Sequence, residues 1–233
     1  MALPKINAAP KYEAVVPSTK QTVRFRPYLV KEEKVLMMAM ETQDNKQAMA
    51  AVVDTIESCV SEPIDKNKLT TFDVEYLFTR IRAKSVGETV KTGLKCENCE
   101  HPNEMVIPIE EIKIEVPDID SKIEIADNIN LVLRWPRYND VTDLSDFKSQ
   151  TEMTFAMIER CIESVETAEE KIMFKDESAA DKQAFIESLS GDQFTKLKEF
   201  MEAMPQMKHT LEFKCGKCGH DNNVELQGMQ DFL

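Results

Sequence analysis

The sequence predicts an α+β protein, with a mainly helical body, short antiparallel strands and a site built from two distant Cys-x-x-Cys motifs. Apolar residues recur at helical spacing over much of the chain and alternate with polar residues in shorter segments. Only six glycines occur in 233 residues, against an ordinary share of about 7%. This scarcity disfavours glycine-rich nucleotide-binding folds and all-β folds with many tight turns.

Residues 1–30 are predicted to form an extended arm followed by a β-hairpin. The first ten residues contain two prolines and little periodicity. Apolar and polar residues then alternate in two short runs on either side of Pro17-Ser-Thr-Lys-Gln, a cluster that is typical of a turn.

Residues 31–90 form the first predicted helical region. Two amphipathic stretches are separated by the polar run that starts at Gln43, which indicates two helices with a short break. A third helix is predicted over residues 70–85, where Thr70-x-x-Asp73 offers an N-terminal cap. Its apolar residues follow the i, i+3, i+4, i+7 pattern: Val74, Leu77, Phe78 and Ile81.

Residues 91–138 contain the first Cys-x-x-Cys motif and alternate in hydrophobicity, which predicts short strands and a hairpin turn at Asp127-Asn128. Residues 139–206 return to helical periodicity. Within them, one apolar stripe from Phe155 to Val165 predicts a single helix.

Residues 207–233 contain a strand, the second Cys-x-x-Cys motif and a C-terminal tail. The sequence leaves open whether the tail from Gly228 onward docks on a neighbour or packs on its own domain. We expect the five segments to form one compact domain that the two motifs close.

The strongest local signal is a pair of matched sequences, each of which is a strand that enters a Cys-x-x-Cys turn and is followed by a return strand. They read Leu94-Lys-Cys-Glu-Asn-Cys-Glu-His101 and Phe213-Lys-Cys-Gly-Lys-Cys-Gly-His220, and an asparagine follows each, Asn103 or Asn222. Two such knuckles supply four thiolates, the ligand set of a closed tetrahedral zinc site. The predicted ligands of this zinc-ribbon-like site are Cys96, Cys99, Cys215 and Cys218.

The spacing of the two motifs favours a structural role for the metal. Because 115 residues lie between Cys99 and Cys215, the ion would join the middle of the chain to its end and close a long loop. Four thiolates leave no open position for catalysis, and neither motif opens a helix in the way that a redox Cys-x-x-Cys does. Unmetallated or disulfide-linked knuckles are alternatives, as is His101 or His220 in place of a cysteine, although we expect both histidines outside the ligand set.

The composition and the missing motifs exclude several functions. The net charge of −13 disfavours a protein that coats nucleic acid, because neutralising phosphates needs a clustered basic surface. No phosphate-binding loop, dinucleotide-binding motif, metalloprotease motif or nucleophile elbow occurs, so an enzyme is not expected. Neither a membrane span nor a secretory signal is predicted, and the cysteine pattern favours an intracellular protein with a metal site. The remaining cysteines, Cys59 and Cys161, are predicted to be buried small apolar residues.

Two long segments of the chain carry a resemblance to a known family. The first is Ala2-Leu-Pro-Lys-Ile-Asn, continued by Val23-Arg-Phe-Arg-Pro-Tyr-Leu-Val-Lys-Glu-Glu-Lys34. The second is Phe72-Asp-Val-Glu-Tyr-Leu-Phe-Thr-Arg-Ile-Arg-Ala-Lys-Ser-Val-Gly87. Together with the C-terminal helix, strand and Cys-x-x-Cys-Gly motif, they resemble the T4-like bacteriophage baseplate hub subunits and hub assembly proteins.

The resemblance implies a non-enzymatic hub subunit or a chaperone-like hub assembly factor that acts through protein–protein contacts. The implied partners are other phage baseplate hub proteins or a second copy of the chain, with neither nucleic acid nor a membrane among them. The implied location is the host cytoplasm during assembly, with presence in the virion tail baseplate left open. A zinc-ribbon adaptor acting on transcription or nucleic acid in the infected cell is the alternative.

Overall fold

A computed structural model describes residues 9–42, 44–144, 147 and 149–228. The chain combines helices with antiparallel strands, as the sequence predicts. The extended arm expected at the N-terminus and most of the C-terminal tail lie outside the described residues. None of the described helices has the length and apolar character needed to cross a membrane.

The chain folds into two compact units, a different division from the five segments expected from the sequence. Unit 1 consists of residues 1–66, 72–115 and 206–233. Unit 2 consists of residues 67–71 and 116–205. Most of unit 2 is therefore inserted between two stretches of unit 1.

Unit 1 begins with the predicted hairpin and the predicted pair of helices. Strands β1 (Tyr12–Val15) and β2 (Thr22–Phe25) pair antiparallel. Helices α1 (Val30–Glu41) and α2 (Asn45–Cys59) follow, with the break where the polar run predicts it. Asp44 explains the new start, because its side chain accepts hydrogen bonds from two backbone amides in the first turn of α2.

Helix α3 (Thr71–Val86) confirms the third predicted helix. The carboxylate of Asp73 is fully buried and accepts hydrogen bonds from the backbone amide and the hydroxyl of Ser18, at 2.9 and 2.6 Å. This acid therefore ties the turn of the first hairpin to the start of α3. The predicted apolar face of the helix is buried: Val74, Leu77, Phe78 and Ile81.

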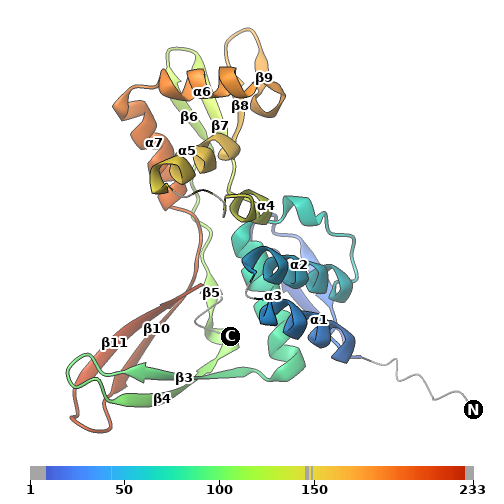
Figure 1. The fold of residues 1–233 in the computed structure, drawn as a ribbon, viewed down its shortest axis with the longest axis vertical. Coiled ribbons are helices and arrows are strands. Elements are labelled where there is room, and N and C mark those ends of the chain that lie inside the picture. Colours follow the sequence, from blue (N-terminus) through green and yellow to red (C-terminus); the bar gives the residue numbers. More distant parts are fainter. Residues whose placement is uncertain (1–8, 43, 145–146, 148, 229–233) are drawn as a thin grey trace, which may run out of the picture. The chain divides into compact units, whose positions relative to one another are not determined.

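Two long hairpins complete unit 1 (Figure 1). Strand β3 (Thr89–Lys95) pairs with β4 (Pro102–Pro108), and β10 (Met207–Lys214) pairs with β11 (Asp221–Gln227). The short strand β5 (Lys113–Ile114) adds to the free edge of β10. A shared apolar cluster packs the two hairpins and the end of α3 together: Ala83, Val90, Ile107, Ile109, Ile112, Met207 and Leu226.

Unit 2 contains a four-stranded antiparallel sheet in the order β6-β7-β8-β9. The first two strands form the hairpin predicted at Asp127-Asn128, and Asn128 adopts the left-handed backbone conformation of such a turn, with φ of 60°. The strands are β6 (Lys122–Ala126), β7 (Ile129–Leu133), β8 (Ile162–Glu166) and β9 (Lys171–Met173).

In the described part of unit 2, helices accompany this sheet: α4 (Tyr138–Thr142), α5 (Gln150–Cys161), α6 (Ala179–Glu187) and α7 (Gly191–Glu202). The break before α7 falls at Ser190, whose hydroxyl caps the new helix. The apolar core of the unit joins the sheet to these helices: Leu131, Leu133, Ile158, Ile162, Val165, Phe174, Ile186, Leu197 and Phe200.

The single helix predicted from Phe155 to Val165 is wrong, because α5 ends at Cys161 and the chain continues as strand β8. Strand β8 is central, with β7 and β9 on its two sides. Ser164 and Val165 point to opposite faces of the sheet, and both are buried. Glu163 is exposed between buried Ile162 and Ser164, so apolar and polar residues do not alternate along this strand in the way that identifies a half-buried strand in a sequence.

The two cysteines outside the Cys-x-x-Cys motifs are buried, as predicted. Cys59 and Cys161 are 2% and 1% exposed. Burial raises the pKa of Cys59 to about 11 and that of Cys161 to about 12. Both thiols therefore remain protonated near neutral pH and pack as small apolar groups.

Candidate metal centre

The two Cys-x-x-Cys motifs form the turns of the β3–β4 and β10–β11 hairpins, and both turns have the same hydrogen bonds. In the first, the amide of Cys96 donates to the carbonyl of His101 at 3.0 Å, and the amide of Glu100 donates to the carbonyl of Cys96 at 2.9 Å. In the second, the amide of Cys215 donates to the carbonyl of His220 at 2.9 Å, and the amide of Gly219 donates to the carbonyl of Cys215 at 3.0 Å. The internal repeat in the sequence is therefore a repeat of backbone geometry.

The residue after the second cysteine of each motif has a left-handed backbone. Glu100 has a φ of 55°, and Gly219 has a φ of 72°. Glycine adopts this conformation at little steric cost, whereas a glutamate there is strained. The first knuckle thus uses a less favourable residue at the same structural position.

The four sulfurs of the predicted site lie within 4.8 Å of one another. The Sγ atoms of Cys96 and Cys218 are 3.7 Å apart, as are those of Cys99 and Cys215. A tetrahedral zinc with Zn–S bonds of about 2.3 Å would separate its sulfurs by about 3.8 Å. The four cysteines therefore have the chemistry and the spacing to hold one tetrahedral metal ion.

An asparagine from each hairpin locks the two knuckles together. The Oδ1 atom of Asn103 accepts from the amide of Gly216 at 2.9 Å, and the Oδ1 atom of Asn222 accepts from the amide of Glu97 at 2.9 Å. Each asparagine side-chain oxygen thus accepts from the backbone amide of the residue that follows the first cysteine of the opposite knuckle. Each Nδ2 group donates at 2.9 Å to the histidine carbonyl of its own knuckle.

The cluster is only partly shielded from solvent. Cys96 and Cys215 are buried, Cys99 is half-buried and Cys218 is exposed. Backbone and side-chain N–H groups reach the sulfurs, among them the Lys217 amide at 3.4 Å from the Cys215 sulfur. Such N–H···S contacts stabilise the thiolate form that a metal requires.

The thiols of the cluster differ in acidity. Backbone amides, that of Cys218 first, lower the pKa of Cys215 to about 6. The His220 amide is the main cause that lowers the pKa of Cys218. The His101 amide also lowers the pKa of Cys99, but burial and the three neighbouring sulfurs outweigh it and raise that pKa to about 12. Four adjacent sulfurs cannot all ionise without a cation, because the thiolates repel one another. A divalent metal would offset this repulsion.

The two histidines take part through their backbone. Their carbonyls accept the hydrogen bonds from Cys96, Cys215 and the two asparagines. In the part of the chain that the structure describes, the group able to hold a metal comprises the four cysteines and neither His101 nor His220.

No role for Asn103 and Asn222 was predicted from the sequence. A signal was present, because each lies four positions after the second cysteine of its motif. Their roles depend on which backbone amides face them across the two hairpins, and the repeat in the sequence does not show this pairing.

The turns of two hairpins bring four cysteines together in unit 1, and this cluster could hold a metal ion. A family model described as T4 bacteriophage base plate protein matches residues 9–233. The chain belongs to this family, and the baseplate resemblance of its sequence motifs is confirmed. Searches of curated proteins and of solved structures gave no match.

Proposed function

We propose that the chain is a non-enzymatic component of the phage baseplate hub, either a hub subunit or a chaperone-like factor that assembles it. The observation that carries this proposal is the family match over residues 9–233. A baseplate is built by contacts between proteins, so the proposed partners are other baseplate hub proteins or a second copy of the chain. The proposed setting is the host cytoplasm during assembly.

A structural zinc ion completes the proposal. Cys96, Cys99, Cys215 and Cys218 would hold it, and their sulfur spacing supports this assignment. The ion would supply a cross-link with no open coordination position. It would fix the β3–β4 hairpin to the β10–β11 hairpin, and the Asn103 and Asn222 bonds already align the two turns for that purpose.

Affinity isolation from infected cells, compared with the protein content of purified virions, tests the assembly role. A tagged chain is expected to co-purify with baseplate hub proteins, and its presence or absence in virions separates a resident subunit from an assembly factor. Co-purification with RNA polymerase or nucleic acid, with no baseplate protein recovered, would contradict the proposal and favour the zinc-ribbon adaptor.

A further inference from the structure

Unit 2 contains a pocket of about 390 Å³ lined mainly by cations. The end of α5 and the start of β8 form one side, and residues around the end of β9 form another. The cations that line the pocket are Lys68, Arg134, Arg137, Arg160, Lys175 and Lys182. Two carboxylates, those of Glu159 and Glu163, also line it.

This concentration of positive charge stands out against an acidic background. Residues 67–71 and 116–205 contain eleven Lys and Arg against twenty Asp and Glu. Six of these eleven cations line this pocket. A concave site lined by one sign of charge focuses its field and attracts ligands of the opposite sign.

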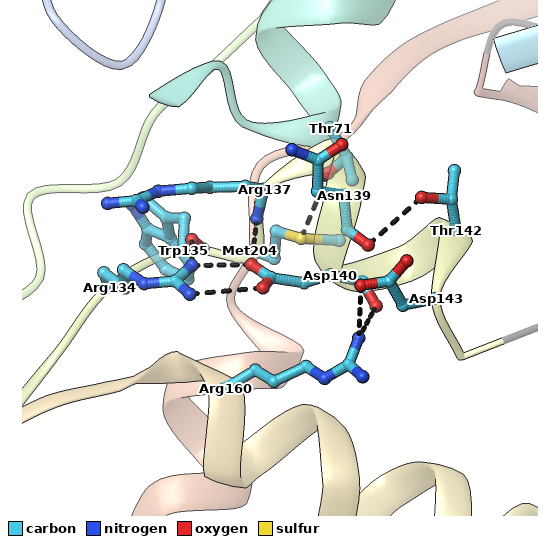
Figure 2. Close-up of polar contacts among 10 residues, drawn as sticks. All are labelled: Thr71, Arg134, Trp135, Arg137, Asn139, Asp140, Thr142, Asp143, Arg160 and Met204. Carbon is cyan, nitrogen blue, oxygen red and sulfur yellow. Dashed lines mark hydrogen bonds and ion pairs between the residues drawn. The ribbon is translucent and has the colours of Figure 1, made fainter. Parts of the chain in front are cut away.

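Two of the arginines are held in place by acids of α4 and the residue after it (Figure 2). Arg134 forms a two-pronged ion pair with Asp140, at 2.6 and 3.2 Å. Arg160 donates to the backbone carbonyl of Asp140 at 2.8 Å, and its ion pair with Asp143 is longer, at 3.6 Å. These bonds orient both guanidinium groups and restrict their motion.

Arg137 is different, because only its backbone takes part in this network. Its amide donates to Asp140 at 2.8 Å. Figure 2 draws no interaction for its guanidinium group, and within the described residues no hydrogen bond or ion pair engages it. The guanidinium of Arg137 therefore presents its donors without an acid to neutralise them.

The lining favours a carboxylate ligand over a phosphate ligand. The guanidinium fork of an arginine binds a carboxylate or a phosphate in a bidentate geometry, so the other lining residues decide between the two ligands. A nucleic acid backbone would place successive phosphates against Glu159 and Glu163, whereas a peptide can alternate acidic with apolar or basic side chains. The pocket also offers apolar surface from Ile162, Met173 and Phe174.

We propose that this pocket binds an acidic peptide segment of a partner protein, with Arg137 as the main carboxylate contact and Lys175 and Lys182 as supporting charges. The proposal concerns unit 2 and does not depend on the metal centre of unit 1. A partner site of this kind would give specificity and fast association more than high affinity.

Fluorescence anisotropy with the full chain and a fluorescein-labelled hexapeptide that alternates glutamate with alanine tests the proposal. Saturable binding is expected, and Arg137→Ala is expected to weaken it about tenfold, the effect of losing one charge-assisted contact. Arg137→Lys retains the positive charge but loses the bidentate guanidinium group, so its affinity for the peptide should lie between those of the unmodified protein and Arg137→Ala. Lys175→Ala, at an exposed position, should weaken binding without a folding defect.

Lys171→Ala is the matched control, because Lys171 is also an exposed lysine near this pocket but pairs with Glu166 and does not line it. An equal loss of binding in Lys171→Ala and Lys175→Ala would overturn the proposal in favour of unspecific attraction. Absence of saturable binding would also overturn it. Tighter binding of a six-nucleotide single-stranded DNA than of the peptide would assign the pocket to phosphates instead.

Discussion

Asn103 and Asn222 form equivalent hydrogen bonds in opposite directions across the two knuckles, each accepting from a backbone amide of the other hairpin at 2.9 Å. The two hairpins are therefore joined by matched polar contacts as well as by the cysteine cluster. Both hydrogen bonds lie outside the sulfur cluster, so they hold the two turns together in addition to any cross-link through the cysteines.

Replacing Asn222 should weaken both the fold and the metal site. Asn222 is 2% exposed, so Asn222→Ala leaves the Glu97 amide and the His220 carbonyl without their side-chain partner. The expected loss is about 1–3 kcal/mol in the free energy of unfolding. Thermal and denaturant unfolding measure it. Asn223→Ala, at the exposed neighbouring position, is the control, and equal effects of the two variants would contradict the assigned role.

Purified protein should contain about one zinc ion per chain, and Cys215→Ser should remove most of it. Loss of a ligand opens the closed shell and should also lower the unfolding temperature. Elemental analysis and a colorimetric zinc-release assay provide the measurement. Cys161→Ala tests specificity, because it removes a buried thiol outside the cluster and should leave the zinc content unchanged. A chain without metal and with six free thiols would refute the zinc assignment.

The backbone conformation after each motif predicts two opposite effects of glycine. Glu100→Gly should stabilise unit 1 by about 1 kcal/mol, because it relieves the left-handed strain at a φ of 55°. Gly219→Ala should destabilise it by a similar amount, since alanine is strained at a φ of 72°. Chemical denaturation of the metal-loaded proteins compares them. A destabilising Glu100→Gly would show that the glutamate side chain contributes more than its backbone strain costs.

Glu32 should make the stability of unit 1 depend on acid pH. Burial alone would raise its pKa, but hydrogen bonds from Arg26, the Leu29 amide and Lys31 outweigh burial and lower the pKa from 4.5 to about 2. The carboxylate is 7% exposed and lies 2.8 Å from Arg26. A lowered folded-state pKa adds stability above pH 4.5, up to about 3 kcal/mol, that is lost as the pH falls toward 2.

The variant Glu32→Gln cannot ionise, so it should be less stable than the unmodified protein at pH 7, and the difference should shrink as the pH falls below 5. Urea unfolding at several pH values measures this. The exposed neighbour Glu33→Gln provides the control. If the difference in the free energy of unfolding stays constant between pH 7 and pH 3, the charge of Glu32 does not contribute to stability.

Features set by neighbouring residues in the chain were predictable from the sequence. The break between α1 and α2 follows from the capping side chain of Asp44, and the break before α7 follows from Ser190. The four cysteines were predictable as a cluster because two thiols per turn, repeated once, match one tetrahedral metal. In these cases the residues of one short motif supply the interactions that determine the structure.

Features set by residues distant in the chain were not predictable. The sequence places Asp73 in a local cap, but it does not show that the carboxylate also accepts two hydrogen bonds from Ser18 in the first hairpin turn. The strand at Ile162–Glu166 was missed because its buried residues include Ser164, so apolar and polar residues do not alternate along it, while Ile158, Ile162 and Val165 keep helical spacing. The reciprocal bonds of Asn103 and Asn222 likewise depend on the pairing of two hairpins.

The insertion of unit 2 has a consequence for the order of folding during synthesis. All residues of unit 2 have been made once the ribosome passes Pro205, whereas unit 1 still lacks β10, β11 and two of the four cysteines of its cluster. Unit 1 therefore cannot complete its fold until the last residues of the chain have been made, whereas the inserted unit 2 can fold earlier, on the ribosome. During that interval the β3–β4 knuckle has only two of the four sulfurs of the cluster, because Cys215 and Cys218 are made last.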